Sequence, residues 1–295
     1  MLTPQLINWL LLGFLVITWG TSFMVTSVAI EGGLTALTIT LLRISLGATV
    51  VTLFAYSRGL RLPLNAKSWG SFMLLGLFGS ALPFILISWG QQSVTSASTG
   101  VLMAVMPFVT MLIAHYFVEG ETLNRYKISG LIIAFSGVTF LLNPFAAGSV
   151  DLFGALAILA AASSYALNTV MIRLLPKFNP LVAGSGMLLC GALLILPFVL
   201  SDVENIIQEL TYIAKPNSIM AVIWLGLMPS GVASIIYFVV VNRAGPSFLS
   251  NCNFLIPVVA YFAGTLILND AVSSNSLIAL IGILAGVALT RVKRR

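Results

Sequence analysis

Residues 75–80 read Leu-Gly-Leu-Phe-Gly-Ser, and residues 225–230, 150 positions later, read Leu-Gly-Leu-Met-Pro-Ser. The first three residues and the final serine are the same in both stretches. Along the same shift, Pro107 coincides with Pro257. These matches keep one order in both halves of the chain, which chance similarity between apolar segments would not readily produce. The chain is therefore predicted to consist of two related halves.

A short polar stretch near the midpoint separates the two halves. Residues 143–151 contain Pro144 and Gly148, and proline and glycine commonly interrupt helices and mark loops. We expect a first five-span repeat over residues 1–143 and a second over residues 151–292. Together the two repeats would form one integral membrane unit.

The composition places the chain in a membrane. Of its 295 residues, 59% are hydrophobic and 7% are charged, and the mean hydropathy is +1.08. A soluble chain carries about 25% charged residues. A transmembrane helix needs about 20 mainly apolar residues. The predicted fold class is therefore an all-α membrane protein with ten transmembrane helices, near residues 6–30, 34–57, 69–90, 93–117, 126–143, 151–175, 180–200, 218–242, 247–268 and 275–292.

The positive charges indicate how these spans are oriented. Of the fourteen Lys and Arg residues, twelve fall on the side that holds both termini, Lys215 falls on the other side, and Arg43 lies inside the second span. Cytoplasmic loops retain Lys and Arg. We therefore expect a multi-pass protein of the cell (inner) membrane with cytoplasmic N- and C-termini. The net charge of +6 is explained by this orientation and does not indicate nucleic-acid binding.

Five spans in each half mean that the second half enters the membrane from the side opposite to the first. Inverted-topology repeats of this kind are typical of transporters that expose a central site alternately to the two sides of the membrane. A duplicated scaffold without transport activity is the alternative interpretation of the same pattern, and a pore is another.

Short motifs recur along the whole chain. In the first half they are Trp19-Gly20-Thr21-Ser22-Phe23, Arg43, Gln91-Gln92-Ser93-Val94-Thr95-Ser96-Ala97, Pro107, Glu121-Thr122-Leu123, Gly130 and Gly137-Val138. These motifs resemble those of the EamA family of the drug/metabolite transporter superfamily. The second half matches more loosely, through Tyr165-Ala166 and Pro257, and has no counterpart of Glu121. The resemblance implies a basket-like helical fold, a central cavity lined by spans 1, 3, 4, 6, 8 and 9, and export of amino acids or other small metabolites.

Aromatic, amide and hydroxyl side chains on the cavity-lining spans are the candidate substrate-binding residues. An aromatic ring offers an apolar surface and a cation-π contact to an ammonium group, while amides and hydroxyls hydrogen-bond a carboxylate. The same residue types also collect at membrane interfaces and between helices, which is the structural alternative for each of them. The candidates are Trp19, Ser22, Trp89, Gln91, Tyr165, Asn168, Tyr237 and Asn253.

Arg43 is the charge placed deepest in a predicted span. Insertion scales put the cost of such a charge at about 2.5 to 3.5 kcal/mol, so it should face the protein interior and have a partner. One role is contact with an anionic group of the substrate, a carboxylate or a phosphate. The other is structural, in which the guanidinium caps backbone carbonyls or anchors the two halves. The resemblance makes the second span peripheral to the cavity, which favours the structural role.

Pro107 and Pro257 occupy equivalent positions in the fourth and ninth spans. A proline inside a helix removes one backbone hydrogen bond and kinks the helix. Matched kinks would serve either as pivots of alternating access or as the curvature that close packing requires. Neither role brings these prolines into contact with substrate.

The positions of the Asp, Glu and His residues argue against proton coupling and against catalysis. All eight Asp and Glu residues fall at helix ends or in loops, and the single histidine, His115, lies near the inner end of the fourth span. Proton-coupled carriers commonly depend on a carboxylate inside the membrane. An integral-membrane enzyme needs a clustered nucleophile, base or metal set. We therefore expect gradient-driven transport, with no enzyme activity, catalytic residue, metal or cofactor.

The most direct interpretation is a secondary transporter that exports amino acids or related small metabolites by alternating access. A channel-like facilitator is the first alternative, and a non-transporting membrane receptor or scaffold is the second. The expected partners are a small-molecule substrate and the lipid bilayer. The small-residue step from Gly282 to Gly286 would suit close helix packing inside one chain or in a homodimer.

Overall fold

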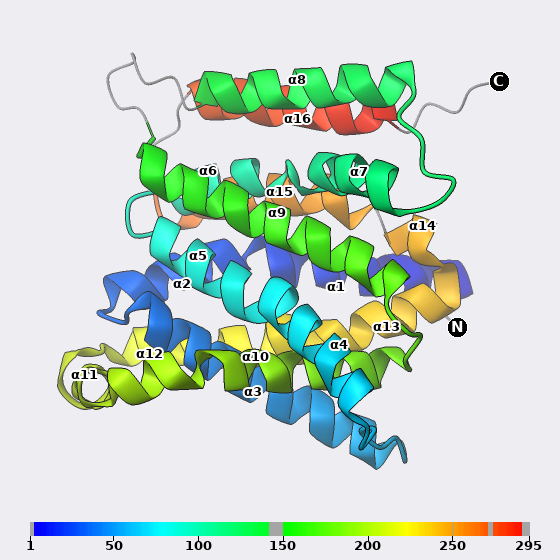
Figure 1. Cartoon of the computed structure of the whole chain (residues 1–295). Helices are drawn as coiled ribbons and strands as arrows, with labels where there is room; N and C mark the ends of the chain where they lie inside the picture. The colour runs from blue at the N-terminus through cyan, green and yellow to red at the C-terminus, as the bar shows by residue number, and fades with distance from the viewer. Residues whose placement is uncertain (1–2, 142–149, 250, 271–273, 291–295) are drawn as a thin grey trace.

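The computed structural model describes residues 3–141, 150–249, 251–270 and 274–290, and within these ranges the chain is helical with no strand. Figure 1 shows the helices running side by side across the molecule. In the first half they are α1 (Pro4–Gly20), α2 (Ser22–Glu31), α3 (Ala36–Ser57), α4 (Ala66–Gly76), the π-helix η1 (Leu77–Ala81), α5 (Leu82–Gly90), α6 (Ser96–Met103), α7 (Met106–Phe117) and α8 (Arg125–Leu141).

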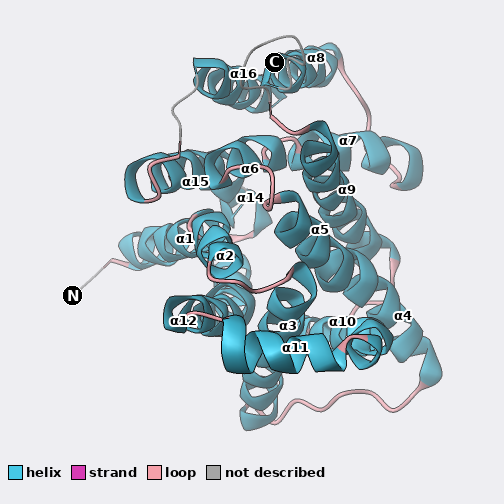
Figure 2. Ribbon diagram, turned by 90° about the vertical axis from the view of Figure 1, so that its left-hand side faces the viewer, coloured by secondary structure: helices cyan, strands magenta, loops and turns pink. Residues whose placement is uncertain are grey.

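The second half has a similar order of helices, with a short helix and a π-helix added between its second and third spans and with the helix breaks at different places. Its elements are α9 (Leu152–Leu174), α10 (Pro180–Ser201), α11 (Val203–Gln208), the π-helix η2 (Glu209–Ile213), α12 (Pro216–Leu225), the π-helix η3 (Gly226–Val232), α13 (Ala233–Ala244), α14 (Pro246–Leu249), α15 (Cys252–Ile267) and α16 (Ser274–Thr290). The helix α11 lies crosswise at one end of the bundle (Figures 1 and 2).

Polar N-cap residues determine where many of these helices begin. The side chains of Thr3, Thr35, Asn65 and Thr95 each accept a hydrogen bond from the backbone N–H three residues later, at 3.3, 3.4, 2.8 and 3.2 Å. The first amides of a helix have no partner inside the helix, so a cap of this kind removes unsatisfied donors before the chain enters an apolar region. The starts of α1, α3, α4 and α6 are thus encoded locally.

Seven helical segments in the described residues are long and apolar enough to cross a membrane. Three other predicted spans correspond to α8, α15 and α16, which contain 17, 16 and 17 residues. A spanning helix usually has about 17 to 25 residues, so the number of ten spans stays a prediction. The seven segments are Pro4–Glu31, Ala36–Ser57, Ala66–Gly90, Ser96–Phe117, Leu152–Leu174, Pro180–Ser201 and Pro216–Ala244.

The two stretches that recur in the sequence adopt the same unusual backbone. Residues 77–81 form η1, and residues 226–232 form η3, which contains Pro229. A π-helical turn leaves backbone carbonyls outside the regular i to i−4 ladder, where side chains from other elements can reach them. The recurrence at 150 positions therefore marks a structural feature of both halves.

Helices of one half pack against helices of the other throughout the bundle. The helix α8 lies along α16 (Figure 1), α6 packs on α15, α2 on α12, and α5 on α9. The contacts of the π-helices are reciprocal: α3 packs against η3, and α10 packs against η1. Seen along most of the helices, as in Figure 2, the two halves are interleaved and do not form separate lobes.

The fourth predicted span is broken and not simply kinked. The segment α6 ends at Met103, two turn residues follow, and α7 begins at Met106 with Pro107 in its first turn, where a missing N–H costs nothing. In contrast, Pro257 lies inside the continuous helix α15. The predicted pair of equivalent kinks is therefore a helix break in one half and an internal proline in the other.

Candidate functional site

The guanidinium of Arg43 lies in the interior of the bundle. Arg43 is on α3 and is 7% exposed, and its Nε donates a hydrogen bond of 3.0 Å to Oγ of Ser230 in η3. Because α3 packs against η3, a side chain of the second span reaches a π-helix 187 positions later in the chain. Arg43 therefore faces the protein interior, as its place in the second span predicts.

Aromatic rings surround this charge on another side. The Cζ atom of Arg43 lies 4.0 Å from the centre of the Phe84 ring on α5, which is the geometry of a cation-π contact. The ring of Tyr165 on α9 packs edge-on against Phe84, with 6.4 Å between the ring centres. The helices α3, α5 and α9 thus each contribute one side chain to the same place.

Trp19 approaches the neighbouring residue of the same π-helix. Its Nε1 donates a hydrogen bond of 3.1 Å to the carbonyl oxygen of Pro229, and its ring lies 6.1 Å from the ring of Tyr237 on α13. Trp19 and Arg43 therefore bind adjacent residues of η3 from different helices. We call Trp19, Arg43, Phe84, Tyr165, Ser230 and Tyr237 the Arg43 cluster.

Two predicted amide residues are buried with unused acceptor atoms. Nε2 of Gln91 donates to the carbonyl of Phe23 at 2.9 Å and to Oγ of Ser27 at 3.0 Å, while its Oε1 has no hydrogen-bond partner. Asn168 lies on α9, three residues beyond Tyr165, and its Oδ1 is also buried without a partner. A buried acceptor without a donor is unfavourable, which makes both atoms candidates for contact with a ligand.

The other predicted residues are placed differently. The hydroxyl of Ser22 donates at 2.6 Å to the carbonyl of Trp19, at the break between α1 and α2. Trp89 is 48% exposed at the end of α5, which suits contact with the membrane interface. Asn253 is half-buried in the first turn of α15. These three side chains are not part of the Arg43 cluster.

Phe84 and Ser230 were not among the predicted site residues. The signal for Ser230 was present, because it is the second-half counterpart of Ser80 in the recurring stretch. In contrast, Ser80 bonds back to the carbonyl of Gly76 in its own segment, so the two equivalent serines differ in use. Phe84 carries no comparable signal in an apolar run that is rich in phenylalanine.

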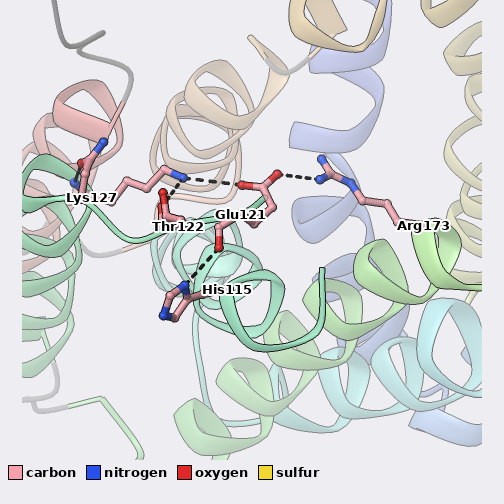
Figure 3. A network of polar contacts seen from close by, with 6 residues as sticks. His115, Glu121, Thr122, Lys127 and Arg173 are labelled. Atoms are coloured by element: carbon pink, nitrogen blue, oxygen red, sulfur yellow. Dashed lines mark hydrogen bonds and ion pairs between the residues drawn. The ribbon is translucent and has the colours of Figure 1, made fainter. Parts of the chain in front are cut away.

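A second polar group lies at one end of the bundle, around the loop between α7 and α8 (Figure 3). Oε1 of Glu121 accepts from Arg173 at 2.7 Å, and Oε2 lies 3.6 Å from Nζ of Lys127. Lys127 also donates to the carbonyl of Thr122 at 2.8 Å, and Nδ1 of His115 lies 3.0 Å from the carbonyl oxygen of Glu121. This end network joins the ends of α7, α8 and α9.

The charges of the end network affect the acidity of Glu121. The hydrogen bond from Arg173, supported by Lys127, lowers the pKa of the Glu121 carboxyl below its ordinary value, although partial burial opposes the shift. The carboxylate form is therefore favoured here. The ring of His115 contacts the loop backbone at the carbonyl of Glu121.

Acidic residues at the opposite end of the bundle bind helix N-termini. Oε2 of Glu209 accepts from the backbone N–H of Thr35 at 3.0 Å, ahead of α3. Oδ2 of Asp270 accepts from the hydroxyl of Ser96 at 2.7 Å and from the N–H of Ala97 at 3.0 Å, in the first turn of α6. Carboxylates at these positions satisfy free amides and complement the positive ends of the helix dipoles. Nowhere in the described ranges do three or more His, Cys, Asp or Glu residues group as a metal site would require.

Comparison with known proteins shows that this chain is similar to transporters. The model of the EamA-like transporter family matches the chain twice, at residues 7–143 and 152–292. A curated relative, the uncharacterized transporter YoaV of Bacillus subtilis, is 27% identical over 285 residues, which cover 94% of each chain. An uncharacterized transporter of Archaeoglobus fulgidus is 23% identical and covers 97% of this chain and 99% of its own.

Two further similarities concern substrate and fold. A protein of Streptantibioticus cattleyicolor named a probable terminal-alkyne amino-acid exporter is 24% identical over 249 residues, which cover 83% of this chain and 80% of that protein. A solved structure titled "Crystal structure of protein" superimposes with a TM-score of 0.67 at 22% sequence identity, and covers 95% of this chain and 96% of the other. The fold is therefore one that has been observed experimentally.

Proposed function

The chain belongs to the EamA-like transporter family, and from that premise we propose that it exports amino acids or related small metabolites across the cell membrane by alternating access. The observation that carries the proposal is the Arg43 cluster. It combines one cation, several aromatic rings and a hydroxyl in the interior of the bundle, and its members come from both halves of the chain. A site of mixed apolar and polar groups is what a small metabolite requires.

The proposal includes an inverted-repeat architecture with ten spans. It is supported by the two separate matches to the family model, by the π-helices at equivalent positions, and by the reciprocal packing of α3 on η3 and α10 on η1. In inverted-repeat transporters, substrate sites lie near the middle of the membrane between the repeats. The Arg43 cluster fits this placement.

The proposed orientation has both termini in the cytoplasm. The ends of α3, α7, α9 and α13 lie near the N-terminus of the chain, on the right in Figure 1. The loops and helix ends there contain Arg58, Arg125, Arg173 and Arg243. An excess of Lys and Arg is typical of cytoplasmic loops. The end that carries α11 would then face outward.

The amino-acid class is suggested by one relative that is named an amino-acid exporter. Gradient-driven transport is proposed because no Asp or Glu is placed in the middle of a predicted span, where a proton carrier would need one. The proposal does not depend on a cofactor, and the relatives reported above are named as transporters.

Transport can be measured directly with purified protein in proteoliposomes. Uptake of a radiolabelled panel of amino acids and small metabolites is followed with and without an imposed pH gradient, beside protein-free liposomes. We expect saturable uptake of at least one compound, acceleration by unlabelled substrate on the opposite side, and no dependence on the pH gradient. Flux that never saturates would indicate a channel, and the absence of flux for every compound would contradict the proposed function.

A further inference from the structure

Arg43 carries a buried positive charge that no carboxylate of the described residues neutralises. Both ion pairs found in the described part of the chain belong to Glu121, at the end of the bundle. Glu209 and Asp270, two acidic residues that link the halves at the other end, bind Thr35 and the start of α6, and Asp151 accepts from Ser93 there. A charge removed from water without a counter-ion is strongly unfavourable, so this site calls for an anion.

Most hydrogen-bond donors of Arg43 are also unused. A guanidinium has five N–H groups, and the one on Nε donates to Ser230. The four on Nη1 and Nη2 have no hydrogen-bond partner among the described residues. Two Nη atoms in one plane match the two oxygens of a carboxylate.

The surroundings of Arg43 fit the remainder of a small metabolite. Phe84 and Tyr165 provide aromatic surface beside the charge. Oγ1 of Thr40, one helical turn before Arg43 on α3, and Oδ1 of Asn168, one turn beyond Tyr165 on α9, are buried acceptors without partners. Neutral acceptors and aromatic faces suit an ammonium or hydroxyl group better than a second anionic group.

We propose that Arg43 binds the carboxylate of the transported compound, and that the substrate class is small monocarboxylates, with zwitterionic amino acids foremost. This inference rests on the proposed function, because it assigns a role within the transport site. A single cation matches a single negative charge. A phosphate monoester, which carries a charge near −2 at neutral pH, would require a second cation that the Arg43 cluster does not contain.

The test compares each compound with an analogue that lacks the carboxylate. Neutral L-amino acids and their carboxamides are measured side by side, both as substrates in proteoliposomes and as ligands that raise the melting temperature of the purified protein. We expect the wild-type protein to prefer each transported acid over its amide at least tenfold. Inorganic phosphate at the same concentration should not compete.

Substitutions separate a binding role from a structural one. Arg43→Gln should lower kcat/KM for the acid at least tenfold and leave the amide nearly unchanged, so that the acid-to-amide ratio falls toward one. The acid-to-amide ratio of Arg43→Lys should fall between those of the wild type and Arg43→Gln, because an ammonium lacks the planar pair of donors. Arg58→Gln, at the exposed C-terminal end of the same helix, is the matched control and should keep the wild-type ratio.

The outcomes distinguish this inference from the proposed function. Equal losses for acid and amide in Arg43→Gln, a wild-type protein that accepts both equally, or competition by phosphate would overturn the carboxylate site while transport itself stands. An acid that raises the melting temperature of the wild type but not of Arg43→Gln supports the site even if no flux is seen. If Arg43→Gln does not fold, the acid-to-amide ratio is measured instead in Arg43→Lys and in Ser230→Ala, in which Nε loses its hydrogen-bond partner. A lowered ratio supports the carboxylate site, and a wild-type ratio in both variants overturns it.

Discussion

Many hydroxyl groups in the spans bond to their own helix. Thr26, Ser80, Thr99 and Thr265 each donate to the carbonyl four residues earlier, at 2.8 to 2.9 Å. Such bonds satisfy a polar group in an apolar region without joining two elements. Side chains such as Trp19, which reach another element, are therefore the ones that specify how the helices meet.

The indole N–H of Trp19 gives a prediction at this scale. Trp19→Phe keeps an aromatic ring but removes the donor to the carbonyl of Pro229, which should lower the free energy of unfolding by about 1 kcal/mol. Thermal or chemical unfolding of the purified protein in detergent would measure the change. Trp9→Phe is the control, because Trp9 is 47% exposed and packs edge-on against Phe248. An equal effect of both substitutions would contradict the role given to the Trp19 hydrogen bond.

At the scale of elements, glycines determine how closely two helices approach. A Cβ atom on Gly76 would lie 2.7 Å from the backbone nitrogen of Gly191 and 2.7 Å from the carbonyl oxygen of Met187, both on α10. The end of α4 therefore touches the backbone of α10 directly. Neither obstructing atom belongs to a side chain that could rotate away, so the spacing depends on the missing Cβ.

Gly76→Ala should separate α4 from α10 and destabilise the protein by about 1 to 3 kcal/mol, as overpacking of a tight contact does. Gly70→Ala, in the same helix, is the matched control, because nothing lies within 4 Å of the position of its Cβ. That control should be neutral or stabilising by up to about 1 kcal/mol, since alanine has the higher helix propensity. Unfolding curves of the two variants that coincide would show that the close approach is not required.

At the scale of the whole molecule, bonds between the two halves occur at both ends of the bundle. Thr35 with Glu209 and Ser96 with Asp270 join the halves at the end that carries α11. Glu121 with Arg173 joins them at the other end, as does the hydrogen bond of 3.0 Å from Nε of Arg243 to Oδ1 of Asn8. Alternating access, as proposed, requires one of these two sets to open while the other holds.

The end network also makes the stability of the folded protein depend on pH. Because the pKa of Glu121 is lowered in the folded protein, its contribution to stability is complete above the ordinary carboxyl pKa of about 4.3 and is lost as the pH falls through the folded value. Glu121→Gln should therefore lower the melting temperature near pH 7 and should no longer differ from the wild type in strongly acidic buffer. Partly exposed ion pairs contribute at most about 1 kcal/mol, so the shift is small.

Melting curves between about pH 3 and about pH 8, a range that extends below and above the ordinary Glu pKa of about 4.3, would measure this dependence. Glu119→Gln is the control, because Glu119 is exposed in the same loop and is not a partner in the ion pairs of Glu121 with Lys127 and Arg173. A Glu121→Gln difference that persists unchanged in acid would show that the glutamine acts by some means other than loss of the carboxylate charge.

The sequence by itself determined the class of protein and its family, and it predicted the two related halves. These follow from hydropathy, from the distribution of Lys and Arg, and from the recurrence that includes Gly76 and Gly226, all of which are properties of segments that can be compared without knowing their neighbours. Helix starts at residues such as Thr35 are equally local.

Only the tertiary structure decided which side chains meet. Arg43 and Ser230 are 187 positions apart, and Trp19 and Pro229 are 210 positions apart, so no periodicity within a segment could pair them. The same packing put Phe84 over the guanidinium, although its local sequence is that of an ordinary apolar span. The physical reason is that a buried charge acquires its partners from the helices packed around it, and that packing is a property of the whole bundle.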